Sequence, residues 1–158
     1  MCNMVTRPRA ASDSSGTPKR RLDRHVSFRM PEALFRRLTT AAQIWPGGSR
    51  SRLAVELVDE GLRMRDHPHI VFRSTAVGRR PAIAGGPEIW HIARVLREYP
   101  STEEGLKKTA ELTGLALREV RIANRYYLEF RAEVDRSIDD VDRAAESGAP
   151  AEYFRKIS

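Results

Sequence analysis

Residues 24–31 read Arg-His-Val-Ser-Phe-Arg-Met-Pro, and this stretch decides the fold of the first part of the chain. Apolar side chains alternate with polar ones from residue 25 to residue 30, the pattern of a strand with one apolar and one polar face. Pro31 then occupies a position that is favoured in the first turn of a helix. The sequence therefore predicts one strand that is followed at once by a helix.

Two helices are expected after this strand. Trp45-Pro46-Gly47-Gly48 ends the first, which spans about residues 31–44, and Ser49 is a good N-cap for the second, which runs to about residue 66. Apolar side chains recur at helical spacing in both, at Leu34, Leu38, Ala41 and Ala42 and then at Leu53, Leu57, Val58 and Leu62.

A lone strand leaves an edge of unpaired backbone groups, and its apolar face has no cover. No second strand is expected nearby, so the economical solution is antiparallel pairing with the same strand of a second copy, about a two-fold axis. The four helices of this homodimer then cover the apolar face. His25, Ser27 and Arg29 remain exposed on the other face.

A two-stranded ribbon fits the major groove of double-stranded DNA. Arg29 can donate two hydrogen bonds to guanine, and Ser27 and His25 can donate or accept at base edges. Ser49, Arg50 and Ser51 open the second helix, where free N–H groups and the helix dipole favour a phosphate. The sequence thus predicts that the strand reads the bases of an operator in the DNA and that the start of this helix binds its phosphates.

The charge distribution agrees with a polyanion partner. The chain carries 28 basic and 21 acidic side chains, and residues 1–66 hold 13 of the basic and 7 of the acidic ones. Residues 1–21 have almost no apolar periodicity and are expected to form a disordered basic arm. Its end and the following residues offer non-specific DNA contacts at Lys19, Arg20, Arg21 and Arg24.

Residues 24–66 resemble the ribbon-helix-helix family of bacterial repressors and antitoxins, on the strand that ends at Pro31 and the Gly48-Ser49-Arg50-Ser51 turn. The resemblance implies base reading by His25, Ser27 and Arg29 and phosphate anchoring by Gly48, Ser49 and Arg50. Trp45-Pro46-Gly47-Gly48 departs from the less interrupted turn of the family.

The remainder of the chain is predicted to be helical with a short β-hairpin, so the fold class is mainly α. A strand is expected at 70–73, a turn at 77–81, a helix from about residue 87 to 99, and a helix from a capping box at Ser101 and Glu104 to Gly114. One long helix is expected from about residue 116. Its buried face is marked by Val120, Ala123, Tyr127, Phe130, Val134 and Ile138.

Residues 68–138 resemble a helical domain of bacterial antitoxin-like proteins, the domain of unknown function 433. The similarity lies in His69-Ile70-Val71-Phe72, Ala84-Gly85-Gly86, Trp90 and the helix with Val120, Ala123, Tyr126 and Tyr127. The family's usual Gly-Thr-Arg is Gly78-Arg79-Arg80 here. The resemblance implies an antitoxin whose partner is a PIN-like ribonuclease toxin.

Three uses of this second module stay open. It can form a helix-turn-helix around Gly114, with Arg118, Arg121 and Arg125 toward DNA, although Glu111, Glu119 and Glu129 are interleaved and the net charge is near zero. It can bind a protein through the aromatic side chains of Trp90, Tyr99, Tyr126 and Tyr127, or it can extend the dimer interface. The tail after Pro150 either docks on a partner, through Tyr153, Phe154 and Ile157, or packs back on its own domain.

Several functions are not expected. His67, His69 and His91 lack metal-site spacing, no nucleophile with a base is evident, and no cofactor motif occurs, so neither a metal site nor an enzyme is predicted. Cys2 is the one cysteine, no apolar run is long enough to span a membrane, and no signal peptide is evident. The expected location is the cytoplasm.

The sequence thus predicts a basic arm (1–21), a ribbon-helix-helix domain (22–66), a helical domain (68–146) and a tail (147–158). The expected function is a sequence-specific transcriptional repressor that is also the antitoxin of a toxin–antitoxin pair. The alternatives are a stand-alone regulator, or a protein-interaction module that binds nucleic acid without sequence preference.

Overall fold

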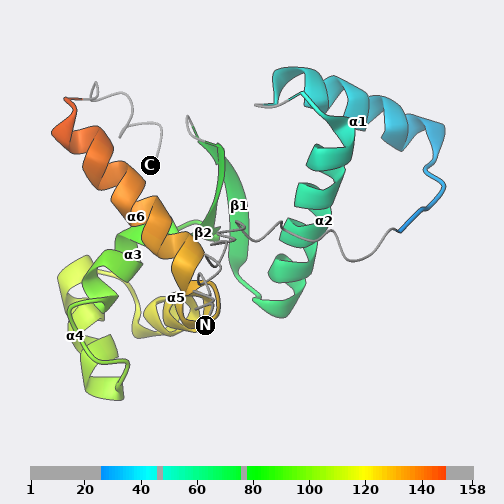
Figure 1. Ribbon diagram of the computed structural model, residues 1–158. Helices are drawn as coiled ribbons and strands as arrows, with labels where there is room; N and C mark the ends of the chain where they lie inside the picture. Colours follow the sequence, from blue (N-terminus) through cyan, green and yellow to red (C-terminus); the bar gives the residue numbers. More distant parts are fainter. Residues whose placement is uncertain (1–25, 46–47, 76–77, 149–158) are drawn as a thin grey trace, which may run out of the picture.

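A computed structural model describes residues 26–45, 48–75 and 78–148 of the chain. Within these ranges the protein is mainly helical with one small antiparallel sheet (Figure 1). No helix among these residues is both long and apolar enough to cross a membrane. In order, the elements are α1 (Glu32–Ile44), α2 (Arg50–Asp66), β1 (Ile70–Thr75), β2 (Gly78–Ile83), α3 (Ile89–Leu96), α4 (Glu103–Thr113), α5 (Leu117–Glu129) and α6 (Arg131–Glu146).

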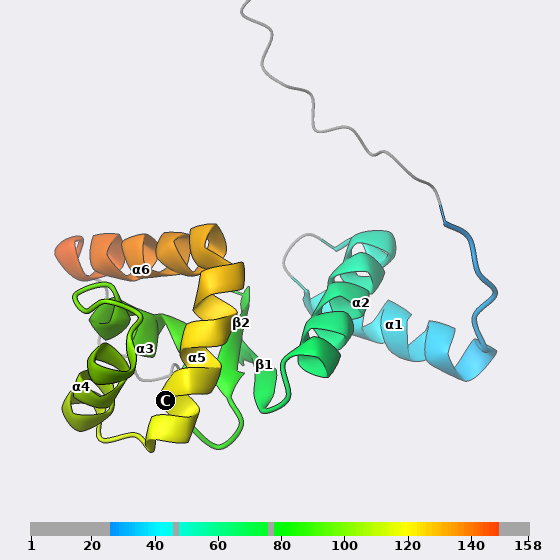
Figure 2. The same cartoon turned by 90° about the horizontal axis from the view of Figure 1, so that it is seen from below.

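The first two helices begin and end where the sequence predicts. Pro31 precedes α1 as its N-cap residue, and the Ser49 hydroxyl caps α2 by accepting from the Arg52 amide at 3.4 Å. α1 and α2 pack on each other and lie to one side of the remaining elements, as Figures 1 and 2 both show. Ala42 and Leu53 are the buried apolar side chains of this pair.

The hydrophobic core lies in the second module. It joins the hairpin to the last four helices, and α3 contacts α4, α5 and α6. α3 is apolar around most of its circumference because it is the central helix, and a helix surrounded by others buries nearly all of its faces. Its buried side chains are Ile89, Trp90, Ile92, Ala93 and Leu96.

The predicted hairpin is present, but its second strand is longer than expected. β1 pairs with β2 in a register that runs from Ile70 opposite Ile83 to Thr75 opposite Gly78. The prediction of a turn over residues 77–81 is therefore wrong for residues 78–81, which belong to β2. Pro81 misled the prediction, since proline is confined to edge strands, and both strands of a two-stranded sheet are edges.

The prediction of one long helix from residue 116 is also wrong. The chain bends at Phe130, whose φ of −111° and ψ of 32° are not helical, so that α5 and α6 run across each other (Figure 2). Both helices turn an apolar face toward α3, and the apolar spacing therefore continues through the bend. The Phe130 ring fixes the bend by packing 4.6 Å from the Tyr126 ring, measured between centroids.

The N-cap of α4 differs from the prediction by one residue. Thr102, rather than Ser101, accepts a hydrogen bond from the Gly105 amide at 3.3 Å. Ser101 instead donates to Asn124 in α5, 3.2 Å away. Gly105 is required at this point because a Cβ there would lie 2.0 Å from the carbonyl oxygen of Pro100.

Candidate nucleic-acid interface

The segment before α1 carries two of the predicted base-reading residues. Ser27 and Arg29 are exposed, as are their apolar neighbours Val26 and Phe28, and the Phe28 side chain is 65% accessible. Residues 26–31 form no strand within the single chain described. The predicted strand would pair with a second copy, so it stays a prediction about the assembly.

Several predicted DNA contacts lie outside the described residues. These are the base-reading His25 and the four non-specific contacts of the arm, Lys19, Arg20, Arg21 and Arg24. The proposed partner-binding residues of the tail, Tyr153, Phe154 and Ile157, lie outside as well.

The predicted phosphate-binding residues come together at the start of α2. Gly48 adopts a left-handed conformation (φ 58°), and its amide donates to the Trp45 carbonyl at 3.1 Å. This turn directs the chain into α2, where Ser49, Arg50 and Ser51 are all exposed. The Ser49 hydroxyl accepts from the Arg52 amide, but the amides of Arg50 and Ser51 have no partner within the helix, so this end can receive a phosphate oxygen.

Arg50 lies against the other helix of the pair. Its guanidinium carbon is 5.0 Å from the centre of the Phe35 ring, a distance within which a cation and an aromatic face attract each other. The contact holds the stem of Arg50 near α1 and leaves the charged group at the surface. A phosphate at the α2 start would therefore meet backbone amides and a nearby positive charge.

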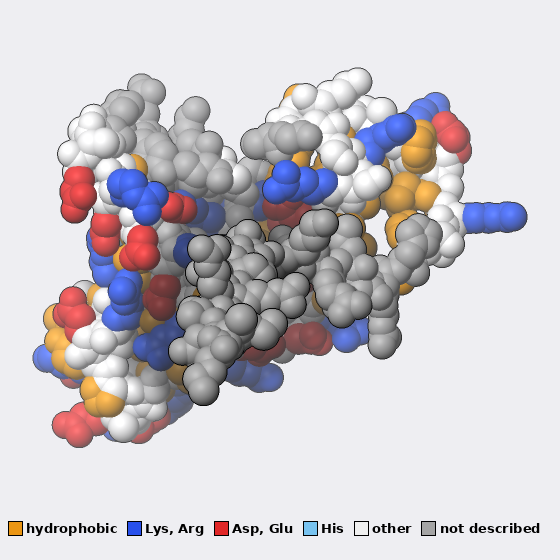
Figure 3. Space-filling model, viewed as in Figure 1, with side chains coloured by type: hydrophobic (Ala, Val, Ile, Leu, Met, Phe, Trp, Pro, Cys, Tyr) orange, Lys and Arg blue, Asp and Glu red, His pale blue; other side chains and the backbone are white. Residues whose placement is uncertain are grey.

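The first module exposes an unusual amount of apolar surface. Ten of the twelve large hydrophobic side chains that are exposed among the described residues belong to residues 26–64. Figure 3 shows part of this surface around α1. We call it the apolar face, and it consists of Val26, Phe28, Leu34, Phe35, Ile44, Val55, Leu57, Val58, Leu62 and Met64.

A polar face of α2 attaches the first module to the second. Arg79 of β2 donates through Nε to both carboxylate oxygens of Glu60, at 2.7 and 2.8 Å. Arg63 donates to Glu133 of α6 at 2.7 Å and to the hydroxyl of Tyr126 at 3.1 Å. These charged contacts fix the orientation of α2 relative to the second module.

Burial and hydrogen bonding shift two pKa values at this junction. Burial raises the pKa of Tyr126 to about 12, so the hydroxyl stays protonated and accepts from Arg63 through its oxygen. For Arg63, burial alone would lower the pKa, but the hydrogen bonds to Glu133 and Tyr126 raise it above its ordinary value. Arg63 therefore carries its charge at every physiological pH.

His67 ends the same face of α2. Its Nε2 lies 2.9 Å from a carboxylate oxygen of Glu129, and its ring is buried against the rings of Tyr126 and Phe130. This packing gives His67 a structural role. The described residues contain no cluster of His, Cys, Asp and Glu that could hold a metal ion.

These junction residues are not among those that the sequence predicts to be functional. Glu60, Arg63 and His67 are three and four positions apart, so they share one face of α2. That spacing is a signal for a polar helix–helix contact. It does not reveal the partners, because Arg79, Glu129 and Glu133 are distant in sequence.

The hypothesis of an aromatic protein-binding surface is wrong for three of its four residues. Trp90, Tyr126 and Tyr127 are buried in the core, and only Tyr99 is partly accessible. Trp90 donates through Nε1 to Glu88 at 2.5 Å, and Tyr127 donates to Asp135 at 2.9 Å. Their polar atoms are thus satisfied inside the protein.

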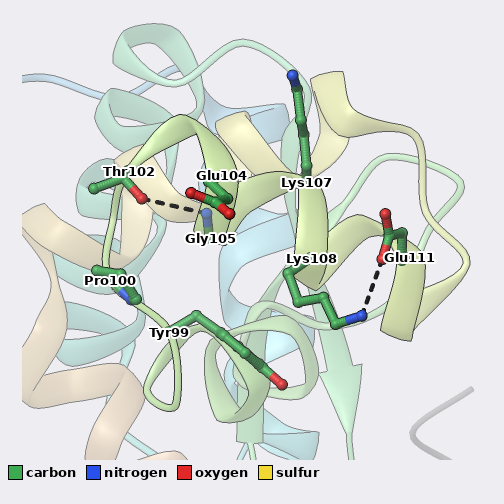
Figure 4. A pocket seen from close by; sticks show the side chains of 8 residues that line it. All are labelled: Tyr99, Pro100, Thr102, Glu104, Gly105, Lys107, Lys108 and Glu111. Atoms are coloured by element: carbon green, nitrogen blue, oxygen red, sulfur yellow. Dashed lines mark hydrogen bonds and ion pairs between the residues drawn. The ribbon is translucent and has the colours of Figure 1, made fainter.

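A groove beside α4 does not have the features of a ligand site (Figure 4). Lys108 is paired with Glu111 at 3.1 Å, and Thr102 is occupied as a helix cap. Lys107 and Tyr99 point away from each other in Figure 4. A ligand site needs polar groups that converge on one position, and this groove lacks them.

Comparisons with known proteins add no relative. No protein-family model, no curated protein and no solved structure matches the chain.

Proposed function

We propose that the protein is a homodimeric, sequence-specific DNA-binding repressor of the ribbon-helix-helix type. The observation that carries the proposal is the apolar face, which a single chain leaves uncovered. Ten exposed large apolar side chains within one small module are more than a soluble monomer usually leaves uncovered, and they indicate an interface.

A second copy of the chain is the partner that we expect to cover this apolar face. The face includes Val26 and Phe28, which precede α1 in a segment with no strand partner in its own chain. Pairing this segment with its symmetry mate would satisfy both sets of backbone groups and bring the apolar side chains of two chains together. Covering a sheet face with helices is also the usual way to complete a small two-layer fold.

The proposed dimer would present Ser27 and Arg29 from both copies on the outer face of the ribbon, together with His25. Hydrogen-bonding side chains on a two-stranded ribbon can read base edges in the major groove. The exposed start of α2, with Ser49, Arg50 and Ser51, would hold the flanking phosphates and so fix the register. Repression follows when the operator overlaps a promoter.

We also propose a second role, as the antitoxin of a toxin–antitoxin pair. This role rests only on the resemblance of residues 68–138 to the domain of unknown function 433. It requires a cognate PIN-like ribonuclease, bound through the second module or the tail. Co-expression with the product of a neighbouring nuclease gene tests it: the antitoxin role requires a stable complex and loss of ribonuclease activity. Without both, the protein is a stand-alone regulator.

Fluorescence anisotropy tests the DNA-binding proposal. Full-length protein is titrated into labelled DNA from upstream of its own gene and into a scrambled duplex, at physiological salt. We expect a preference for the upstream DNA, and a His25, Ser27 and Arg29 triple alanine variant that still dimerises should lose it. Arg29→Ala alone should cost about 1–3 kcal/mol of discrimination. Equal, salt-sensitive binding to both duplexes, unchanged in the variant, would mean a protein-interaction module with a basic arm.

A further inference from the structure

The second module contains a helix-turn-helix arrangement. α3, α4 and α5 pack against one another. α4 ends at Gly114, whose φ of 69° is left-handed, and α5 begins at Leu117 after a short turn. Two packed helices joined by a short turn that contains glycine are the unit that presents a second helix to DNA in many regulators.

The solvent face of α5 is basic. Arg118, Arg121 and Arg125 are all exposed and recur every three or four residues, so they lie along one side of the helix. The opposite side is buried in the core through Val120 and Ala123. The helix therefore faces solvent with a row of guanidinium groups.

The acidic residues interleaved with these arginines have other partners. Glu119 accepts from the amide of Ala116 at 3.0 Å and so caps its own helix. Glu129 lies 2.9 Å from His67, and Glu111 is paired with Lys108. Glu111 and Glu129 therefore contact residues other than these arginines.

The three arginines differ in whether an acidic side chain neutralises them. Arg121 forms an ion pair with Glu103 at the start of α4. Arg118 and Arg125 form no ion pair with any residue in the described part of the chain. The two unneutralised arginines are seven residues apart, which places them about two turns, or ~10.5 Å, apart along α5.

We propose that the α5 face is a second DNA-contact surface, in which Arg118 and Arg125 bind phosphates of double-stranded DNA. This inference goes beyond the proposed function, which places DNA contacts on the first module alone. Positive charge at an exposed helix face is what phosphate affinity requires. A protein ligand is less well matched, because the module's aromatic side chains are mostly buried and Leu128 is the large apolar side chain exposed on this helix.

The two surfaces lie on separate parts of the molecule. The hairpin of β1 and β2 lies between the α1–α2 pair and α5 in both views (Figures 1 and 2). We therefore expect one chain to contact two separate stretches of DNA. When one surface is bound to DNA, the effective concentration of the other surface near a second stretch of the same DNA increases.

The test uses four full-length proteins: wild type, Arg118→Ala/Arg125→Ala, Arg29→Ala/Arg50→Ala, and the variant with all four substitutions. Anisotropy with a long duplex gives the slope of log affinity against log salt for each protein. The slope falls by about 1 for each phosphate contact that is lost. We therefore expect the α5 substitutions to reduce it by about 2 per bound chain in both backgrounds.

Arg136→Ala is the matched control. Arg136 is also an exposed arginine, on α6, and its Nε donates to the Ala132 carbonyl at 3.1 Å rather than to an acid. It should leave the slope near that of the wild type. A reduction of about 1 by Arg136→Ala, half of that expected for the α5 double variant, would overturn the proposal, since it would mean that any lost charge has this effect.

The outcomes separate this inference from the proposed function. If the α5 substitutions leave affinity and slope unchanged while Arg29→Ala/Arg50→Ala weakens binding, the α5 surface is refuted and the first module stands. If Arg29→Ala/Arg50→Ala has no effect while the α5 substitutions abolish binding, the proposed function fails and the α5 surface stands. Circular dichroism confirms that each variant is folded.

Discussion

Leu62→Ala measures how much the apolar face contributes to association. Leu62 is 48% exposed in the single chain. Full burial of a leucine side chain contributes about 1.5–3 kcal/mol, so covering the exposed half contributes about 1 kcal/mol. The residue occurs twice in a symmetric dimer, which gives about 2 kcal/mol per dimer. The substitution should therefore weaken the dimer about 30-fold.

Sedimentation velocity over a concentration series measures the dimer dissociation constant of each variant. Leu128→Ala is the matched control, because Leu128 is a leucine of similar exposure, 55%, on α5 of the second module. It should leave the constant unchanged. The reasoning is refuted if Leu62→Ala associates as tightly as the wild type, or if Leu128→Ala weakens association by the same factor.

Three further predictions concern the second module and its junction. Gly105→Ala should lower the unfolding free energy by about 3 kcal/mol in urea titrations, because its Cβ would overlap the Pro100 carbonyl oxygen; an unchanged midpoint would contradict this. In a double-mutant cycle, Arg63→Ala and Glu133→Ala should show a coupling energy of about 1–2 kcal/mol, and additive effects would mean that the ion pair does not hold the junction. Burial raises the pKa of Glu88 in the folded state, so its stabilising effect, measured against Glu88→Gln, should be complete at low pH and decrease as pH rises from about 4.5; a rise would contradict it.

The bounds of α1 and α2 could be predicted because local chemistry determines them. Pro31 and the Ser49 cap start the two helices, and the Trp45–Gly48 segment separates them. These signals act within a few residues, so a sequence pattern contains them in full.

Features that depend on distant residues could not be predicted. The bend at Phe130 leaves no trace in the apolar spacing, because α5 and α6 bury their apolar faces against the same helix. The burial of Trp90 and Tyr126 depends on where three other helices lie. The acids beside the α5 arginines argued against DNA binding in the sequence, and only the fold pairs Glu129 with His67.

The predicted site is tested unevenly by the structure. Ser49, Arg50 and Ser51, which are predicted to bind phosphate, lie together and exposed at the start of α2, and their role stays a prediction. The base-reading role of Ser27 and Arg29 requires a second chain, so it stays a prediction.

Amide hydrogen exchange of residues 24–30 at increasing protein concentration tests the central claim most directly, since it observes the ribbon itself. The account predicts that these amides exchange rapidly in dilute protein and become protected as the dimer forms, in the alternating pattern of an antiparallel pair. Rapid exchange throughout this segment in a protein that sedimentation shows to be a dimer would contradict it, because the copies would then associate without a paired strand.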